Sequence, residues 1–268
     1  MPDDTARDSQ YLSILSGAIH TCAQYRPMFG QGRKGGLSLT QFQTLYRADP
    51  LYNWIGFDSP LMYAAHKAAG GMTSVYRQLG MGCQWIVAQV LRHHLGLTDE
   101  EAEWSYMATK DGKPHKMTLD GRIDLTHVRE KAARARVAAW LEAARVRVGV
   151  TPEMGGKLTG AIFEIRQGYK SKDSKRQVAD IGNAVNAYLH FYLPVVFVLS
   201  TQIDGDVADR YRTEKWLILT GTVTGPATES AFTFLREVVG YDLAAFFERN
   251  SKQIKAEVAE VLKALLTA

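Results

Sequence analysis

The order strand, helix, apolar strand between residues 158 and 201 constrains the fold of this chain most strongly. LTGAIFEIRQ (158–167) reads as a strand, SKRQVADIGNAVNAYLHFY (174–192) as a helix, and LPVVFVLST (193–201) as a strand with few polar residues. A strand that is apolar along its length is buried on both faces, which is typical of parallel strands joined by crossover helices. We therefore predict a βαβ unit within a parallel or mixed sheet.

The remaining periodicity predicts how the rest of the chain is organised. Helical patterns dominate residues 1–110, another apolar strand lies at 216–224, and residues 226–268 are again helical. No internal repeat and no Pro/Ser-rich linker separates these parts. We predict a single α/β domain over 1–268 with a mixed central sheet flanked by helices. Its parts are a mainly helical N-terminal part (1–110), an α/β core (115–225) and C-terminal helices (226–268).

Composition narrows the setting in which the chain works. Two cysteines without paired spacing are typical of a reducing compartment and of a protein without a thiolate metal site. The acidic, polar start MPDDTARDSQ does not resemble a secretory signal, and the run YLPVVFVL is shorter than the roughly 20 residues of a membrane span. We expect a cytoplasmic protein without a membrane partner, whose net charge of +4 permits a polyanionic partner.

The segment FEIRQGYKSKDSKR (163–176) concentrates charge at the end of the first strand. Because alternate residues of a strand share a face, Glu164 and Arg166 should be neighbours, either as a structural ion pair or as part of a site. The strand continues into a cationic stretch beside the start of the next helix, a place that favours anions. Its cations are Lys170, Lys172, Lys175 and Arg176.

A second source of carboxylates is KMTLDGRIDLTHV (116–128), which alternates apolar and polar residues about Asp120–Gly121. This pattern predicts a strand or a short hairpin that carries Asp120 and Asp124. A basic helix at 129–147 follows it. Two carboxylates that hold Mg²⁺ beside further cations suit metal-assisted hydrolysis of a phosphodiester.

A strand-borne acid, a strand with a (D/E)xK-like triplet, a helix and a buried strand together resemble the PD-(D/E)xK nuclease superfamily. FEIRQGYKSKDSKRQVAD (163–180) is similar to the corresponding region of type II restriction endonucleases, in particular of the ApaLI type, and the likeness extends to GGMTSVYRQLGMGCQW (70–85). The nuclease likeness covers roughly residues 120–220. It implies an Mg²⁺-dependent endonuclease that cuts double-stranded DNA at a specific sequence.

The resemblance also implies roles for individual residues. Glu164 would be the central metal-binding acid, and an aspartate of LDGRID the preceding one, with Asp120, beside the glycine turn, preferred over Asp124. Arg166 stands where the superfamily has lysine, and an arginine can stabilise a phosphate but hardly ever acts as a base. Lys170 would assist it, with Lys172 as an alternative replacement for the missing lysine.

An earlier helix often contributes a further acid in this superfamily. In CQWIVAQVL (83–91) the corresponding residue is Gln84, which either holds a metal-bound water or is an ordinary polar position. The glycine pair Gly70–Gly71, in the same region, predicts a break between two helices within 60–97.

Duplex DNA is the partner that the resemblance implies, and a homodimer would match a palindromic site. Phosphate contacts should make binding strongly salt-dependent. Gln31 and Asp204 are possible readers of base edges beside the members of the DNA-binding set. The set predicted to bind DNA is Arg33 and Lys34 in the loop GQGRKGG, Arg134 in the basic helix, Lys172, Lys175, Arg176, and Gln202 after the apolar strand.

Two other function classes fit the same residues. A DNA-binding protein on a nuclease-like fold would keep Glu164 and Arg166 as an ion pair without catalysis. An enzyme acting on a phosphorylated small molecule would use the 163–176 cluster but would need a pocket there. The chain contains no GxxxxGK[ST], GxGxxG or GxSxG motif, which disfavours P-loop hydrolysis, Rossmann dehydrogenation and serine hydrolysis.

Overall fold

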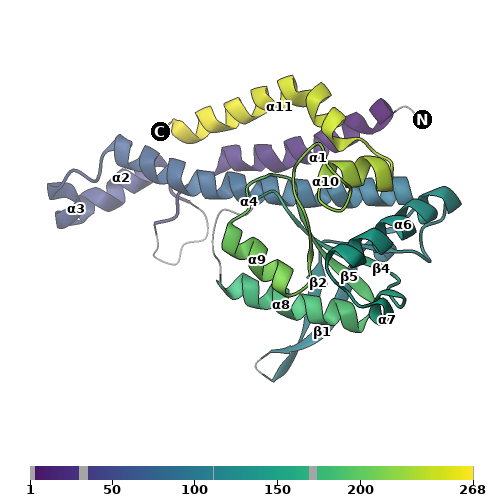
Figure 1. Ribbon diagram of the computed structural model, residues 1–268. Coiled ribbons are helices and arrows are strands. Elements are labelled where there is room, and N and C mark those ends of the chain that lie inside the picture. Colours follow the sequence, from purple (N-terminus) through teal and green to yellow (C-terminus); the bar gives the residue numbers. More distant parts are fainter. Residues whose placement is uncertain (1–3, 30–35, 111, 169–173, 268) are drawn as a thin grey trace. The chain divides into compact units, whose positions relative to one another are not determined.

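The computed structural model describes residues 4–29, 36–110, 112–168 and 174–267, and within these it does not describe the side chains of Asp4, Lys110 and residues 174–181. The chain, drawn in Figure 1, forms two compact units. The sheet unit comprises Met1–Asp8 and Cys83–Glu248, and the helical unit comprises Ser9–Gly82 and Arg249–Ala268.

The sheet unit is built on a four-stranded mixed sheet with the order β3-β4-β5-β6. Strand β3 is antiparallel to β4, whereas β4, β5 and β6 are parallel to one another. Helix α8 (Ser174–Leu189) connects β4 to β5, and α9 (Gly205–Thr213) connects β5 to β6. The predicted βαβ unit and mixed sheet are therefore confirmed. The strands are β3 (Gly121–Asp124), β4 (Gly160–Arg166), β5 (Tyr192–Val198) and β6 (Leu217–Leu219).

Aromatic side chains pack against one face of this sheet. Helix α6 (Lys131–Arg147) lies between β3 and β4 in the chain, and its Trp140 stacks on Phe163 of β4 with ring centroids 6.4 Å apart. Phe234, at the start of the π-helix η3 (Phe234–Val239), contacts both rings at 4.6 and 5.7 Å. The short helix α10 (Ala231–Thr233) precedes it. This face is therefore covered by α6 and the chain around η3.

The opposite face packs against α8, α9 and a second, two-stranded sheet. Strands β1 (Trp104–Lys110) and β2 (Lys113–Leu119) pair with each other as an antiparallel hairpin. Three residues at the base of this hairpin join the core of the sheet face, whereas its far half extends away from the sheet (Figure 1). These residues are Trp104, Tyr106 and Leu119, and they pack with Ile162, Val196, Ala184, Tyr211 and other buried side chains.

Two features of this region differ from the sequence-based expectation. Residues 1–110 were expected to be mainly helical, but α5 is a single turn (Asp99–Ala102) closed by a Thr98–Glu101 capping box, and the strand β1 follows at once. The strands on either side of Asp120 do not pair with each other, because β2 pairs with β1 and β3 pairs with β4. Of the two alternatives predicted for the segment about Asp120–Gly121, the hairpin is therefore wrong and the strand is correct.

The helical unit contains the predicted N-terminal helices, but α4 runs without a break from Pro60 to Leu95 and contributes its last residues to the sheet unit. The expected break at Gly70–Gly71 is wrong. These glycines allow close packing instead, since a Cβ on Gly70 would collide with the Tyr25 ring and one on Gly71 would lie 2.6 Å from Leu265. The other helices of this unit are α1 (Asp8–His20), α2 (Leu39–Ala48), α3 (Pro50–Trp54) and α11 (Leu243–Leu266).

The remaining elements are short. The turns η1 (Asp4–Arg7) and η2 (Thr21–Gln24) flank α1, and α7 (Pro152–Gly155) precedes β4. The C-terminal segment is helical from Ala231 to Val239 and from Leu243 to Leu266, whereas residues 226–230 and 240–242 are not helical. Gly240 ends η3 with a φ of 98°, a conformation that glycine adopts without strain. No helix in the described part of the chain combines the length and apolar character needed to cross a bilayer.

The aromatic packing beneath β4 yields a prediction on stability. Phe163 is fully buried, so Phe163→Ala should lower the free energy of unfolding by about 3–5 kcal/mol through lost burial and a residual cavity. Urea denaturation followed by circular dichroism measures this change. Val146→Ala on α6, at a side chain that is 63% exposed, is the control and should change stability by about 0.5 kcal/mol or less.

Candidate active site

Asp120 is held against β4 by its backbone and its side chain. It directly follows β2 and directly precedes β3. Its N–H donates to the Phe163 carbonyl (3.0 Å), and its Oδ2 accepts from the Ile165 N–H (2.8 Å). The register pairs Gly121 with Phe163, and continuing it places Asp120 opposite Glu164. Directly opposed residues share a face of the sheet, so both carboxylates lie on the face that also carries the hairpin and α8.

Arg166 lies between these two carboxylates. Glu164 and Arg166 are only 6% and 8% exposed, and the Arg166 Nη2 forms an ion pair with the Glu164 Oε1. The Arg166 Nη1 lies 3.4 Å from the Asp120 Oδ2 and donates to the Ile165 carbonyl at 3.1 Å. Buried charges are costly unless they are paired, and here the guanidinium compensates both acids. The sequence expectation that Glu164 and Arg166 are neighbours is met in this arrangement.

Gln84 on α4 joins the same cluster. Its Nε2 donates to the Asp120 Oδ2 (3.1 Å) and to the Ile165 carbonyl (3.2 Å). The side-chain amide therefore fixes one oxygen of Asp120 and one backbone oxygen of β4. The sequence pointed to Gln84 because the superfamily that the chain resembles often has an acid on the corresponding helix. The sequence did not show that Gln84 contacts Asp120.

The oxygen atoms of this cluster suit a hard divalent cation. Mg²⁺ takes oxygen ligands and is typically bound by one or two carboxylates, with water and phosphate oxygens completing its shell. Asp120 and Glu164 offer such oxygens, so the residues fit the expected ion, whereas the Ile165 carbonyl already accepts from Gln84 and Arg166. A cation held by both carboxylates would compete with Arg166 for them. In the described part of the chain, no group of three or more His, Cys, Asp or Glu side chains could hold a metal.

Asp124 has a different role from Asp120. Its Oδ2 accepts from the Tyr192 hydroxyl (2.7 Å), and its Oδ1 accepts from the Thr126 N–H and hydroxyl (2.9 and 2.6 Å). Burial alone would raise the pKa of Asp124, but these hydrogen bonds from Thr126 and Tyr192 outweigh it and lower the pKa below its usual value. Asp124 pairs with Gly160 at the far end of β4, so Asp120 is the aspartate that meets Glu164.

Several predicted site residues lie outside the described structure. Arg33, Lys34 and Gln31 fall within 30–35, and Lys170 and Lys172 fall within 169–173. Lys175 and Arg176 belong to the first turn of α8, and their side chains are likewise outside the described part. Their proposed roles therefore remain predictions.

Two other predicted DNA contacts have defined positions. The Arg134 guanidinium donates twice to the Val128 carbonyl (2.9 and 2.6 Å), and its helix α6 covers the sheet face opposite the carboxylates. The structure therefore does not bring Arg134 to the site. Gln202 is exposed after β5, and a Cβ on Gly168 would lie 3.6 Å from its carbonyl oxygen. Gln202 thus lies at the same end of the sheet as Arg166.

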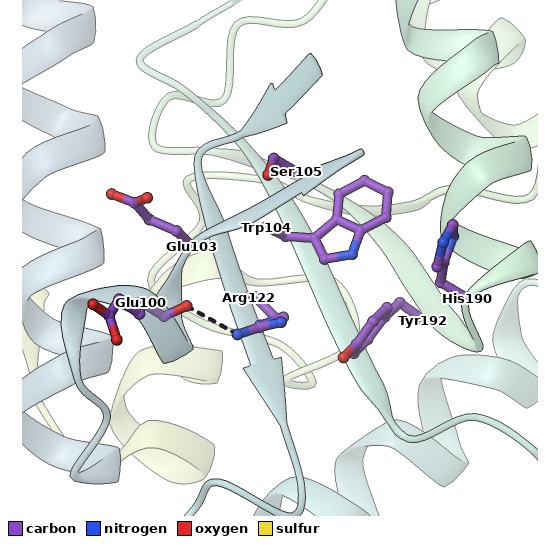
Figure 2. A pocket seen from close by; sticks show the side chains of 7 residues that line it. All are labelled: Glu100, Glu103, Trp104, Ser105, Arg122, His190 and Tyr192. Carbon is purple, nitrogen blue, oxygen red and sulfur yellow. Dashed lines mark hydrogen bonds between the residues drawn. The ribbon is translucent and has the colours of Figure 1, made fainter. Parts of the chain in front are cut away.

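A cavity of about 480 Å³ lies beside the edge strand β3, apart from the carboxylate pair. Figure 2 shows Glu100 and Glu103 on one side of it and the rings of Trp104, Tyr192 and His190 on the other. Its Arg122 donates to the Glu100 and Glu101 carbonyls, both at 2.9 Å. The described lining includes no residue of the 163–176 cluster, so it does not supply the phosphate pocket that a small-molecule enzyme would need.

Comparison of the chain with protein-family models, with curated proteins and with solved structures gives no match. The geometry of the carboxylate pair therefore carries the functional argument by itself.

The hydrogen bond between Tyr192 and Asp124 yields a prediction with a defined pH dependence. Tyr192→Phe should lower the free energy of unfolding at pH 7 by about 1.5–3 kcal/mol, since a buried carboxylate loses a donor. A carboxylate with a lowered folded-state pKa stabilises the protein above its unfolded pKa of about 3.9 and loses this contribution as pH falls through the folded value. The difference between wild type and variant should therefore narrow below about pH 4.

Urea denaturation across this pH range measures the effect. Tyr188→Phe is the matched control, because the Tyr188 hydroxyl donates to the Lys215 carbonyl, which does not titrate. Its stability difference from wild type should stay constant with pH, and a constant difference for Tyr192→Phe would contradict the role given to Asp124.

Proposed function

We propose that this protein is an Mg²⁺-dependent endonuclease that hydrolyses double-stranded DNA at a specific sequence, in the manner of a type II restriction enzyme. The observation that carries the proposal is the meeting of Asp120, directly before β3, with Glu164 on the adjacent strand β4, although the two are distant in the sequence. The mixed sheet and the crossover helix α8 that follows β4 agree with the resemblance of residues 120–220 to PD-(D/E)xK nucleases.

In this proposal Asp120 and Glu164 would hold Mg²⁺. The bound ion supplies a Lewis acid that polarises the phosphate and lowers the pKa of an attacking water. Hydrolysis adds the water oxygen to phosphorus and breaks one ester P–O bond, whose oxygen leaves with a proton. Gln84 keeps the Asp120 carboxylate oriented through its bond to Oδ2.

Arg166 stabilises negative charge rather than accepting a proton. A guanidinium stays protonated in proteins and presents several donors that match phosphate oxygens. The Arg166 guanidinium contacts both Asp120 and Glu164, so it belongs to the same cluster. The amine that the superfamily places at this position would then come from Lys170 or Lys172, or the reaction would proceed without it.

Positive charge supports a polyanionic substrate. The segment 163–176, which includes Glu164 and the end of its strand, carries five cationic side chains against two acidic ones. Lys175 and Arg176 also begin α8, where backbone N–H groups favour phosphate. A homodimer belongs to the same proposal, since two sites related by a two-fold axis would cut both strands of a palindrome, and sedimentation equilibrium tests it.

A specific observation favours a second candidate function. The buried ion pair between Glu164 and Arg166 satisfies both charges in the absence of a metal. A DNA-binding protein that does not cleave would retain this pair for its structural role.

Incubation with long, unmodified double-stranded DNA is the experiment that tests the function. We expect discrete fragments that form with Mg²⁺ and are absent with EDTA, and mapping their ends yields the recognition sequence. DNA that stays intact on substrates of diverse sequence but is retarded in a gel-shift assay would favour the second candidate. If the DNA is neither cleaved nor retarded in the gel, both candidate functions are overturned.

The site assignment has its own variant. Glu164→Gln should reduce the cleavage rate by at least about a hundredfold, since a neutral amide is a poor Mg²⁺ ligand, while an amide oxygen can still accept from Arg166. Glu153→Gln, at an exposed glutamate on α7, removes the same charge away from the site and should cleave like wild type. Full cleavage by Glu164→Gln would refute the role of Glu164.

A further inference from the structure

The hairpin β1–β2 combines a buried base with an exposed far half. Trp104 pairs with Leu119 and Tyr106 with Met117, and these pairs point into the core of the sheet unit. Beyond them, Lys113, Pro114, His115 and Lys116 are all exposed. The core therefore anchors the base firmly, and the far half is free to enter a partner.

One face of the hairpin is exposed along its whole length. Paired residues share a face, so Ser105 with Thr118, Met107 with Lys116 and Thr109 with Pro114 form a single outward surface. All six are exposed, and Met107 is 63% exposed. This surface offers hydroxyl groups, one amine and one flexible apolar side chain, which are groups that contact base edges and the thymine methyl.

The charge of the hairpin favours an anionic partner. Residues 104–119 contain three lysines and one histidine against a single acid, Asp111. Among the residues that the structure describes, neither Lys113 nor Lys116 forms an ion pair. Their amines are thus available to phosphate groups.

The dimensions of the hairpin match the major groove of B-DNA. Seven residues per strand extend about 23 Å, and the four from Met107 to Lys110 extend about 13 Å. The major groove is about 12 Å wide and 8.5 Å deep and admits a two-stranded β-ribbon. The hairpin also leads directly into the candidate site, since β2 ends at Leu119 and Asp120 follows it.

We propose that the β1–β2 hairpin inserts into the major groove of duplex DNA, with the hydroxyl groups and Met107 of its outward face against the bases and Lys113 and Lys116 on the flanking phosphates. This inference rests on the proposed function and adds to it the element that determines sequence preference. It was not apparent from the sequence, where residues 1–110 were expected to be mainly helical.

Binding of the purified protein to duplex DNA in EDTA, followed by fluorescence anisotropy at about 50–200 mM salt, tests the proposal. The double variant Lys113→Ala/Lys116→Ala should bind at least about tenfold more weakly than wild type. The slope of log K against log salt should also fall by about 1.8, or 0.9 per lost phosphate contact. Lys157→Ala is the matched control. It replaces an exposed lysine just before the N-terminal end of β4, and this variant should bind DNA like wild type.

An RNA duplex of the same sequence separates groove insertion from general attraction of charge. The major groove of A-form RNA is deep and narrow, so the hairpin cannot enter it. The double variant and Lys157→Ala should therefore bind the RNA duplex with the same affinity. An equal loss of affinity for RNA and DNA would overturn groove insertion. A double variant that binds DNA as well as Lys157→Ala would overturn the hairpin inference while leaving the nuclease proposal intact. A wild-type chain that binds no DNA would overturn both.

Discussion

Strand β4 is buried at all seven of its positions, yet it carries two charged residues, and this constraint determines the arrangement around it. Neither charge can reach bulk water, so Glu164 and Arg166 must find partners within the protein. They form an ion pair with each other, and the Arg166 Nη1 also contacts the Asp120 carboxylate and the Ile165 carbonyl. The position of Asp120, and with it the start of β3, therefore depends on the pairing that the buried charges of β4 require.

The fold around β4 was largely predictable, because its signals are local. The apolar run of β5 and the helical period of α8 predicted a parallel pair, whereas the pairing of Asp120 rather than Asp124 with Glu164 was only implied by the resemblance and depends on the register of β3 against β4. The hairpin β1–β2 was missed because the capping signal at Thr98 is strong and does not reveal that its helix is a single turn. The alternation of Trp104, Tyr106 and Ala108 was the available signal for β1.

Other parts could not be read from local sequence because they depend on distant partners. Gly70 and Gly71 have the composition of a helix break, and only the packing of Tyr25 and Leu265 shows why α4 tolerates them. Gln84 has no local feature that distinguishes it from a surface glutamine. Its contact with Asp120 exists because α4 and the β2–β3 junction come together in the folded chain.

The junction between hairpin and sheet has a consequence for how this chain can vary. Because side chains alternate along a strand, inserting or deleting one residue at Asp120 would turn the carboxylate away from Glu164. Length changes at the far end of the hairpin would leave Asp120 in place, since the buried pairs at the hairpin base fix the junction independently. Variants with longer or shorter hairpins would therefore keep Asp120 opposite Glu164, so under the proposed function the length of the hairpin can vary independently of the carboxylate pair.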